Sequence, residues 1–105
     1  MKSKLQTLYG FEGIIVDTDL YSAKIIIVKE GEQTPYVYQK KQDKTIYVLQ
    51  GIINLKIENS TKMLNEGDRQ HIGPKIMYSI HAIKGDATIL EVGTKLEDDT
   101  IEVNK

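Results

Sequence analysis

The sequence predicts an all-β fold, a single antiparallel barrel or sandwich of short strands. Apolar runs rich in Ile, Val, Tyr and Thr recur along the chain, and turn residues interrupt them about every 8 to 12 residues. No segment sustains the spacing of an amphipathic helix. The 105 residues match one compact unit that is large enough to bury its own core. We therefore expect residues 1–105 to form a single domain.

The first three expected strands are 13–17, 23–29 and 34–39. The first is a short β-branched run, and the turn signal Glu30-Gly31 separates the second from the third. Residues 25–28 are four consecutive apolar residues, which favours a strand that is covered on both faces. Contact with a second subunit in a homodimer is the simplest explanation for burial of the second face.

Gly51 separates the next two expected strands, 45–50 and 52–58. Apolar and polar residues alternate strictly from Ile53 to Glu58, so one face of this strand is predicted to be buried and the other wet. Four further apolar segments are separated by Asn, Gly, Asp and Pro turn signals. They predict strands at 62–64, 69–72, 78–83 and 87–92.

The two ends of the chain are expected to be extensions of the domain, at 1–10 and 96–105. The second is acidic through Glu97, Asp98 and Asp99 and has little apolar content. We expect it to fray or to lie over a dimer partner.

Composition excludes several classes of function. The net charge is −1, from 14 basic and 15 acidic side chains, which gives no electrostatic reason to expect a nucleic-acid partner. There is no Cys, so disulfides and thiolate metal clusters are excluded. No apolar run is long enough for a signal peptide or a membrane span. These features predict a cytoplasmic protein with no membrane partner.

Two spaced motifs carry the functional signal. The first reads Gly31, five residues, Val37-Tyr38-Gln39, four residues, Lys44, six residues and Gly51. The second reads Gly67-Asp68, three residues, Ile72-Gly73-Pro74-Lys75, two residues and Tyr78. Their spacing resembles the two motifs of the cupins, in particular the small single-domain members of the RmlC-like superfamily that are related to the barrel domain of mannose-6-phosphate isomerase. The resemblance covers 31–93 and implies a cupin β-barrel, also called a double-stranded β-helix or jelly roll.

The resemblance also implies where a metal would be bound, because cupins hold a divalent ion with a His-x-His pair, a Glu and a later His. The corresponding residues here are Val37, Gln39, Lys44 and Tyr78. A transition metal needs imidazole, carboxylate or thiolate ligands, and a protonated Lys repels it. We therefore predict no metal at this site and no other cofactor.

What remains is a predicted pocket for a small molecule, formed by Val37, Gln39, Lys44 and Tyr78. An amide, an ammonium and a phenol can hydrogen-bond a small polar or anionic ligand, such as a carbohydrate. A buried Lys44 needs a partner, which an anionic ligand would supply. In the alternative interpretation Lys44 extends into solvent, and Gln39 and Tyr78 belong to a structural network that fills the barrel.

Two other functions stay open. One is a metal-independent sugar isomerase or epimerase with Lys44 and Tyr78 as acid and base. The other is a dimeric interaction module with a closed barrel and outward-facing tyrosines at 36 and 38. The two histidines, His71 and His81, lie outside the ligand positions and are not expected to be catalytic, and Glu91 is expected to be a solvated or paired strand residue.

Overall fold

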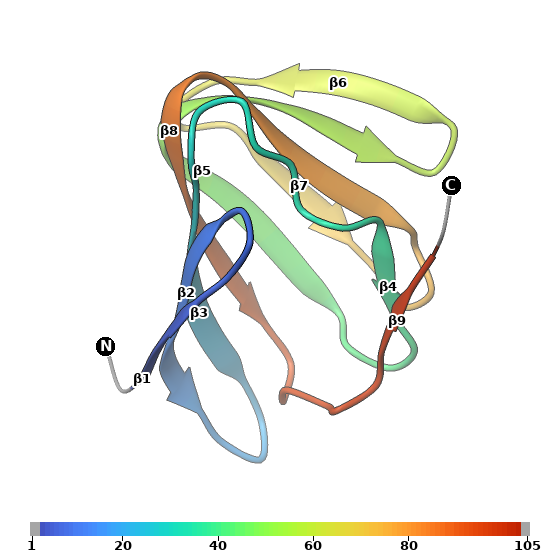
Figure 1. Cartoon of the computed structure of the whole chain (residues 1–105). Helices are drawn as coiled ribbons and strands as arrows, with labels where there is room; N and C mark the ends of the chain where they lie inside the picture. Colours follow the sequence, from blue (N-terminus) through green and yellow to red (C-terminus); the bar gives the residue numbers. More distant parts are fainter. Residues whose placement is uncertain (1–2, 104–105) are drawn as a thin grey trace.

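The computed structural model describes residues 3–103, and every regular element in this part of the chain is a strand (Figure 1). This confirms the all-β prediction. No helix in the described part could span a membrane. The strands are β1 Ser3–Gln6, β2 Gly10–Asp17, β3 Ser22–Val28, β4 Val37–Gln39, β5 Lys44–Ile57, β6 Ser60–Leu64, β7 Arg69–Ile72, β8 Tyr78–Gly93 and β9 Thr100–Glu102.

Two long strands, β5 and β8, organise the fold because each belongs to two layers. They pair antiparallel from Lys44 opposite Gly93 to Ile57 opposite Tyr78. In the first layer β1, β2 and β3 continue into the C-terminal half of β8, the N-terminal half of β5 and β7. In the second layer β9 and β4 continue into the N-terminal half of β8, the C-terminal half of β5 and β6. Figure 1 shows the sheet curled into a half-open barrel.

The sequence predicted strand ends at Gly51 and Gly85, whereas the structure has bends inside continuous strands. Gly51 has a φ of 91° and Gly85 a φ of 72°, both in the left-handed region that favours glycine. The register between β5 and β8 shifts three times between Val48 and Ile53. Such bulges bend a strand sharply without ending its pairing, so one strand serves both layers.

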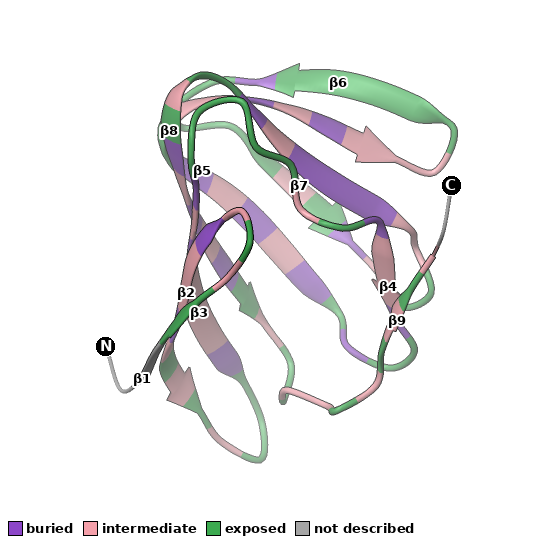
Figure 2. Cartoon of the chain, in the orientation of Figure 1, coloured by how far each residue is buried: buried purple, intermediate pink, exposed green. Residues whose placement is uncertain are grey.

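The core lies between the two layers and follows the predicted alternation (Figure 2). Ile53 and Leu55 are fully buried, as expected from their positions on one face of β5. On β3, Ile26 and Val28 are buried, whereas Ile25 and Ile27 point to the outer side and are half-buried. The inner face of β3 is therefore covered by this chain, and cover of the outer face by a second subunit stays a prediction.

The expectation that the C-terminal tail frays is wrong for residues 100–102, because they form β9 and pair with β4, with Val37 opposite Glu102. Contact of the tail with a dimer partner stays a prediction. The backbone N–H of Lys41 also donates to Asp99 Oδ2 at 2.9 Å, which holds the preceding loop. At the other end β1 pairs with β2, so part of the expected extension 1–10 also joins the sheet. Residues 1–2 and 104–105 lie outside the described part.

Candidate functional site

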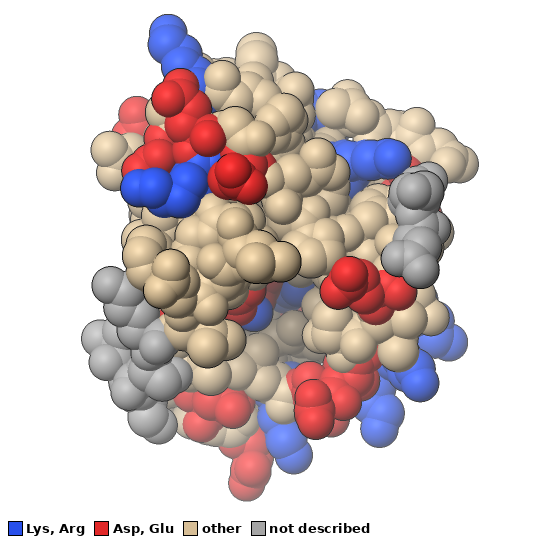
Figure 3. Space-filling view, in the orientation of Figure 1, with Lys and Arg blue, Asp and Glu red and all other residues tan. Residues whose placement is uncertain are grey.

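A cavity of about 260 Å³ opens between the two layers at one end of the barrel. Figure 3 shows the molecule hollowed near its centre, with acidic and basic atoms visible inside the hollow. The wall is mixed, with apolar side chains next to hydroxyl, amide and charged groups. It is lined by Tyr9, Glu12, Lys24, Ile26, Thr34, Pro35, Val37, Gln39, Tyr78, Ile80, Thr100 and Glu102.

Four charged side chains form a row beside the cavity, one from each of four neighbouring strands. In order across the first layer they are Glu12 on β2, Lys24 on β3, Glu91 on β8 and Lys44 on β5. Lys24 Nζ lies 3.1 Å from Glu12 Oε1 and 3.5 Å from Glu91 Oε2, and Lys44 Nζ lies 2.9 Å from Glu91 Oε1. We call this set the charge ladder. Its signs alternate, so its formal charge is zero.

A tyrosine hydroxyl contacts each end of the ladder. Tyr9 donates a hydrogen bond to Glu12 Oε2, and Lys44 Nζ donates one to the hydroxyl oxygen of Tyr78. The Lys44 ammonium also lies 4.5 Å from the centre of the Tyr78 ring, which adds a cation–π contact. The hydroxyl of Tyr78 lies 3.5 Å from Glu91 Oε1. The row is therefore connected from Tyr9 to Tyr78.

Burial and neighbouring charges set the protonation of the ladder. Lys44 and Glu91 are almost fully buried, with side chains 1% and 2% exposed. Burial lowers the pKa of Lys44, although the Glu91 charge opposes this effect. Burial would also lower the pKa of Lys24, but the charges of Glu91 and Glu12 outweigh burial and raise it. For Glu12, burial is outweighed by the Lys24 charge and the Tyr9 hydrogen bond, which lower its pKa.

The structure brings the four sequence-predicted residues to one region but gives them different positions. Val37, Gln39 and Tyr78 line the cavity, whereas Lys44 is buried behind the residues that line it. Gln39 Nε2 donates to Thr100 Oγ1 at 3.3 Å. The alternative in which Lys44 extends into solvent is wrong, because Glu91 supplies a buried partner for its ammonium. A role for these residues in ligand binding stays a prediction.

Sequence reasoning missed Glu12, Lys24 and Glu102 as residues that line the cavity. A signal was present for Lys24, because it lies two residues before Ile26 and so faces the core on the same strand. The same parity relates Glu91 to Ile89, which is why the paired role expected for Glu91 is the one observed. Glu102 lies in the tail that was expected to fray or to lie over a dimer partner, and no sequence pattern there marked it as a lining residue.

The donor set at the four positions that the motif resemblance assigns to metal ligands does not fit a divalent metal. Lys44 presents an ammonium that already contacts Glu91, Tyr78 keeps its phenolic proton, and Val37 has no donor atom. Within residues 3–103, no group of three His, Cys, Asp or Glu side chains is placed to hold a metal ion. His71 is exposed, with Nε2 at 2.5 Å from Asp43 Oδ1. His81 is half-buried and lies opposite Asn54, outside the cavity.

Alkaline pH is expected to destabilise the fold through the buried phenols. Burial, together with the charge of Glu91, raises the pKa of Tyr78 well above 10.0. The folded state therefore holds this proton more tightly than the unfolded state, whose tyrosine titrates at about pH 10. The contribution of the Tyr78 proton to the free energy of unfolding is fully present below about pH 10, and it is lost as the pH rises above that value. Urea unfolding between about pH 8 and pH 11 should show this fall in unfolding free energy.

Tyr78→Phe provides the comparison for that titration. The variant lacks the ionisable group, so its unfolding free energy should fall less over the same pH interval than that of the unmodified protein. An equal fall in both proteins would show that Tyr78 is not the group responsible.

The fold is shared by solved cupin structures, although the sequences differ widely. No protein-family model matches the sequence, and no curated protein is significantly similar to it. An RmlC-like cupin from Shewanella frigidimarina aligns with a TM-score of 0.75 and 15% identity over 84% of this chain and 78% of that one. A Klebsiella pneumoniae protein with a double-stranded β-helix domain gives 0.81 and 12%, over 97% and 85%.

A third similar structure, from Acidithiobacillus ferrooxidans, was proposed to be a sugar phosphate isomerase. It aligns with a TM-score of 0.68 and 22% identity over 79% of this chain and 56% of that one. The TM-scores establish shared architecture, whereas identities of this size leave the chemistry of the site open. From the two-layer topology, the bent strands and these structural matches, we conclude that the chain has the cupin-type double-stranded β-helix fold.

Proposed function

We propose that this protein binds a small polyhydroxylated molecule, a sugar or sugar derivative, inside the barrel and without a metal ion. The observation that carries the proposal is the open cavity with its mixed wall. A volume of about 260 Å³ is slightly below the range of roughly 300–1,000 Å³ usual for drug-sized ligands, and it suits a molecule of monosaccharide size.

The wall matches the two kinds of surface that a sugar presents. Ile26, Val37 and Ile80 offer apolar contact to the C–H groups of a ring. The amide of Gln39 both donates and accepts hydrogen bonds, and the Thr34 hydroxyl does the same, which is the mixed demand of sugar hydroxyls. One structure with this fold was proposed to be a sugar phosphate isomerase, which supports a sugar as the class of ligand.

Independence from metal follows, in this proposal, from the presence of Lys44, a cation of the charge ladder, at a position that the resemblance assigns to a metal ligand. A divalent ion near Lys44 Nζ would face a buried cation, and the carboxylate that could offset the repulsion already contacts that ammonium at 2.9 Å. The ligand's hydroxyl groups are therefore bound directly by side chains.

Saturation-transfer NMR and titration calorimetry with a panel of monosaccharides test the proposal. Val37→Trp should fill the cavity and weaken binding by at least about tenfold, because Val37 lines the wall. Tyr38→Trp is the matched control, since Tyr38 is the next residue on β4 and lies outside the lining. Binding should be unchanged in the control and in the presence of a chelator.

Each of three results would contradict the proposal. No monosaccharide binds, binding disappears with the chelator, or Val37→Trp binds as well as the unmodified protein. Thermal unfolding of both tryptophan variants, measured in parallel, shows that any loss of binding comes from a folded protein.

A metal-independent isomerase or epimerase is less well supported by this geometry. Lys44, its assumed acid or base, lies behind the cavity wall and is held by Glu91. The raised pKa of Tyr78, caused mainly by burial, makes its phenol a poor base at neutral pH. Proton transfer to a ligand would therefore have to involve other residues.

The closed-barrel interaction module is also less well supported, because the interior contains a cavity and Tyr36 is buried, with its hydroxyl donating to the carbonyl of Glu58 at 3.0 Å. The outer face of the first layer nevertheless presents apolar side chains, including Ile25, Ile27 and Leu90, that are only half-buried. We propose that a second copy covers this face. Light scattering in solution tests this, and a monomeric mass at micromolar concentration would contradict it.

A further inference from the structure

The cations of the charge ladder are already neutralised, and this limits which sugar derivatives the cavity accepts. Lys24 is the ladder cation that lines the cavity, and it contacts two carboxylates, those of Glu12 and Glu91. Lys44 lies behind the wall and contacts Glu91 at 2.9 Å. An incoming carboxylate or phosphate would therefore have to compete with an existing carboxylate for either ammonium.

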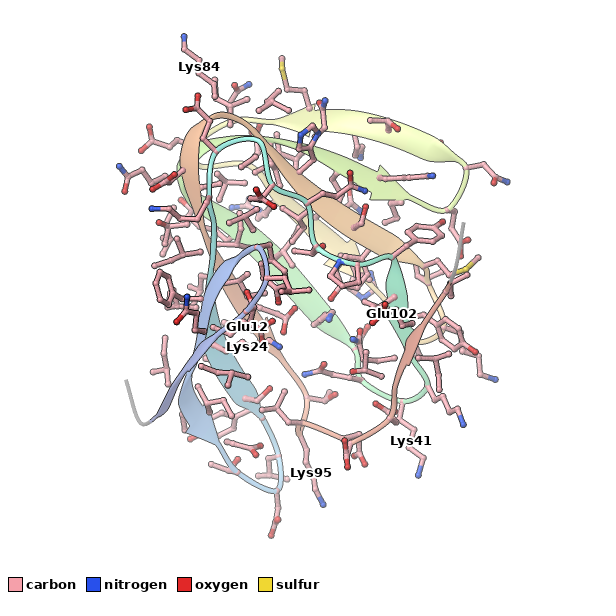
Figure 4. The ribbon with its side chains drawn as sticks, in the orientation of Figure 1. Glu12, Lys24, Lys41, Lys84, Lys95 and Glu102 are labelled. Carbon is pink, nitrogen blue, oxygen red and sulfur yellow. The ribbon has the colours of Figure 1, made fainter. Side chains whose placement is uncertain are left out.

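Glu102 adds a further negative charge on the opposite wall. It comes from β9, lines the cavity and is exposed. Figure 4 shows Glu12 and Lys24 on one side of the hollow and Glu102 on the other. Among residues 5–103, whose side chains the structure describes, Glu102 takes part in no ion pair. The charged groups that line the cavity are thus Glu12, Lys24 and Glu102, with a formal sum of −1.

Glu91 contributes to this balance from behind the cavity wall, because it is not one of the lining residues. Its side chain is 2% exposed, and Oε2 has no hydrogen-bond partner among the described residues, although Lys24 Nζ lies 3.5 Å away. This oxygen therefore depends on its ion pair with Lys24, and an anionic ligand that drew Lys24 away would leave a buried charge without a partner. The electrostatics of the site thus disfavour a further negative charge, and the carboxylate of Glu102 favours a positive one.

We infer that the cavity selects its sugar by charge, preferring an amino sugar to the neutral sugar and rejecting the sugar acid, with Glu102 as the residue that contacts the ammonium group. The inference rests on the proposed function. It concerns the choice among sugars, so it can fail while sugar binding itself stands.

Matched sets of sugars test the inference. Glucosamine, glucose and glucuronate, with the corresponding galactose and mannose derivatives, are titrated against the protein at about pH 6.5, where most of the amine is protonated. The amino sugar should bind about twofold to fivefold more tightly than the neutral sugar, as expected for a partly exposed ion pair. The sugar acid should bind at least about tenfold more weakly than the neutral sugar.

Variants of Glu102 identify the source of the preference. Glu102→Gln should abolish the difference in affinity between the amino and neutral sugars. Glu102→Lys should improve binding of the sugar acid. Asp98→Asn removes an exposed acidic residue nearby in sequence that does not line the cavity, and it should keep the preference of the unmodified protein.

The possible results separate the two proposals. If the sugar acid binds most tightly, or if Glu102→Gln keeps the preference for the amino sugar, the inference about charge is wrong and sugar binding stands. If no member of any set binds, the proposed function and this inference are both wrong. Loss of the preference in Asp98→Asn as well would show that general surface charge, and not Glu102, is responsible.

Discussion

Replacing Glu91 by Gln is expected to lower the free energy of unfolding by about 3–5 kcal/mol, the largest effect among the site residues. Glu91 is the carboxylate that Lys44 Nζ contacts at 2.9 Å, and both side chains are almost fully buried. The substitution removes the negative charge and leaves the ammonium in a poorly solvated place, where an unpaired charge is costly. Urea unfolding at pH 7 measures the loss.

Two comparisons establish that burial of the pair is the cause. Asp86→Asn breaks the Lys29–Asp86 ion pair, whose side chains are 53% and 49% exposed, and it should leave the free energy of unfolding nearly unchanged. Adding Lys44→Met to Glu91→Leu removes both members of the buried pair and should recover most of the stability that Glu91→Leu loses alone. A loss of less than about 1 kcal/mol in Glu91→Gln would show that Lys44 is not charged or not dependent on Glu91.

Gly51→Ala is expected to destabilise the protein by at least about 2 kcal/mol, because two costs coincide at the bend of β5. The φ of 91° is unfavourable for any residue with a Cβ. A Cβ at this position would also lie 2.6 Å from the carbonyl oxygen of Asp86 and 2.9 Å from the Cα of Ala87. Both are backbone atoms of β8, so the contact can be relieved only by a movement of β5 away from β8 at the bend.

Gly85→Ala separates the two costs. Gly85 also has a positive φ, of 72°, but a Cβ there would meet no atom within 4 Å. Only the conformational cost applies, so Gly85→Ala should lose about 1 kcal/mol, clearly less than Gly51→Ala. Thermal or urea unfolding of the two variants measures the difference. Equal losses would show that the close approach of β5 to β8 at the bend does not limit stability.

The fold was predictable because, in most strands, the pattern of apolar and polar residues indicates which face is directed toward the core. In β5, the alternation from Ile53 to Glu58 identifies the buried face directly, and Ile53 and Leu55 are fully buried. The continuity of β5 and β8 was not predictable in the same way. A glycine between two apolar runs marks a tight turn as readily as a bulge, and only the pairing of the two strands decides between them.

The candidate site was predictable only where a spaced motif marked it. Val37, Gln39 and Tyr78 were placed in the interior by their spacing, and they line the cavity. The partner of Lys44 could not be identified from local sequence, because Glu91 comes from a distant strand and is brought close by the β5–β8 pairing. The edge strands β1 and β9 are only four and three residues long, so their patterns are too short to be recognised.

The charge ladder also affects which register the strands β3 and β8 adopt during folding. In β3 the run Ile25 to Val28 is apolar throughout, so hydrophobic burial alone distinguishes weakly between the native pairing with β8 and one shifted by two residues. In the native pairing Lys24 lies opposite Glu91. A shift of two residues would place Lys24 opposite Ile89 or Gly93 and would leave buried charges unmatched. The polar side chains that border the cavity thus also penalise misaligned strand pairings, which an entirely apolar interior would tolerate.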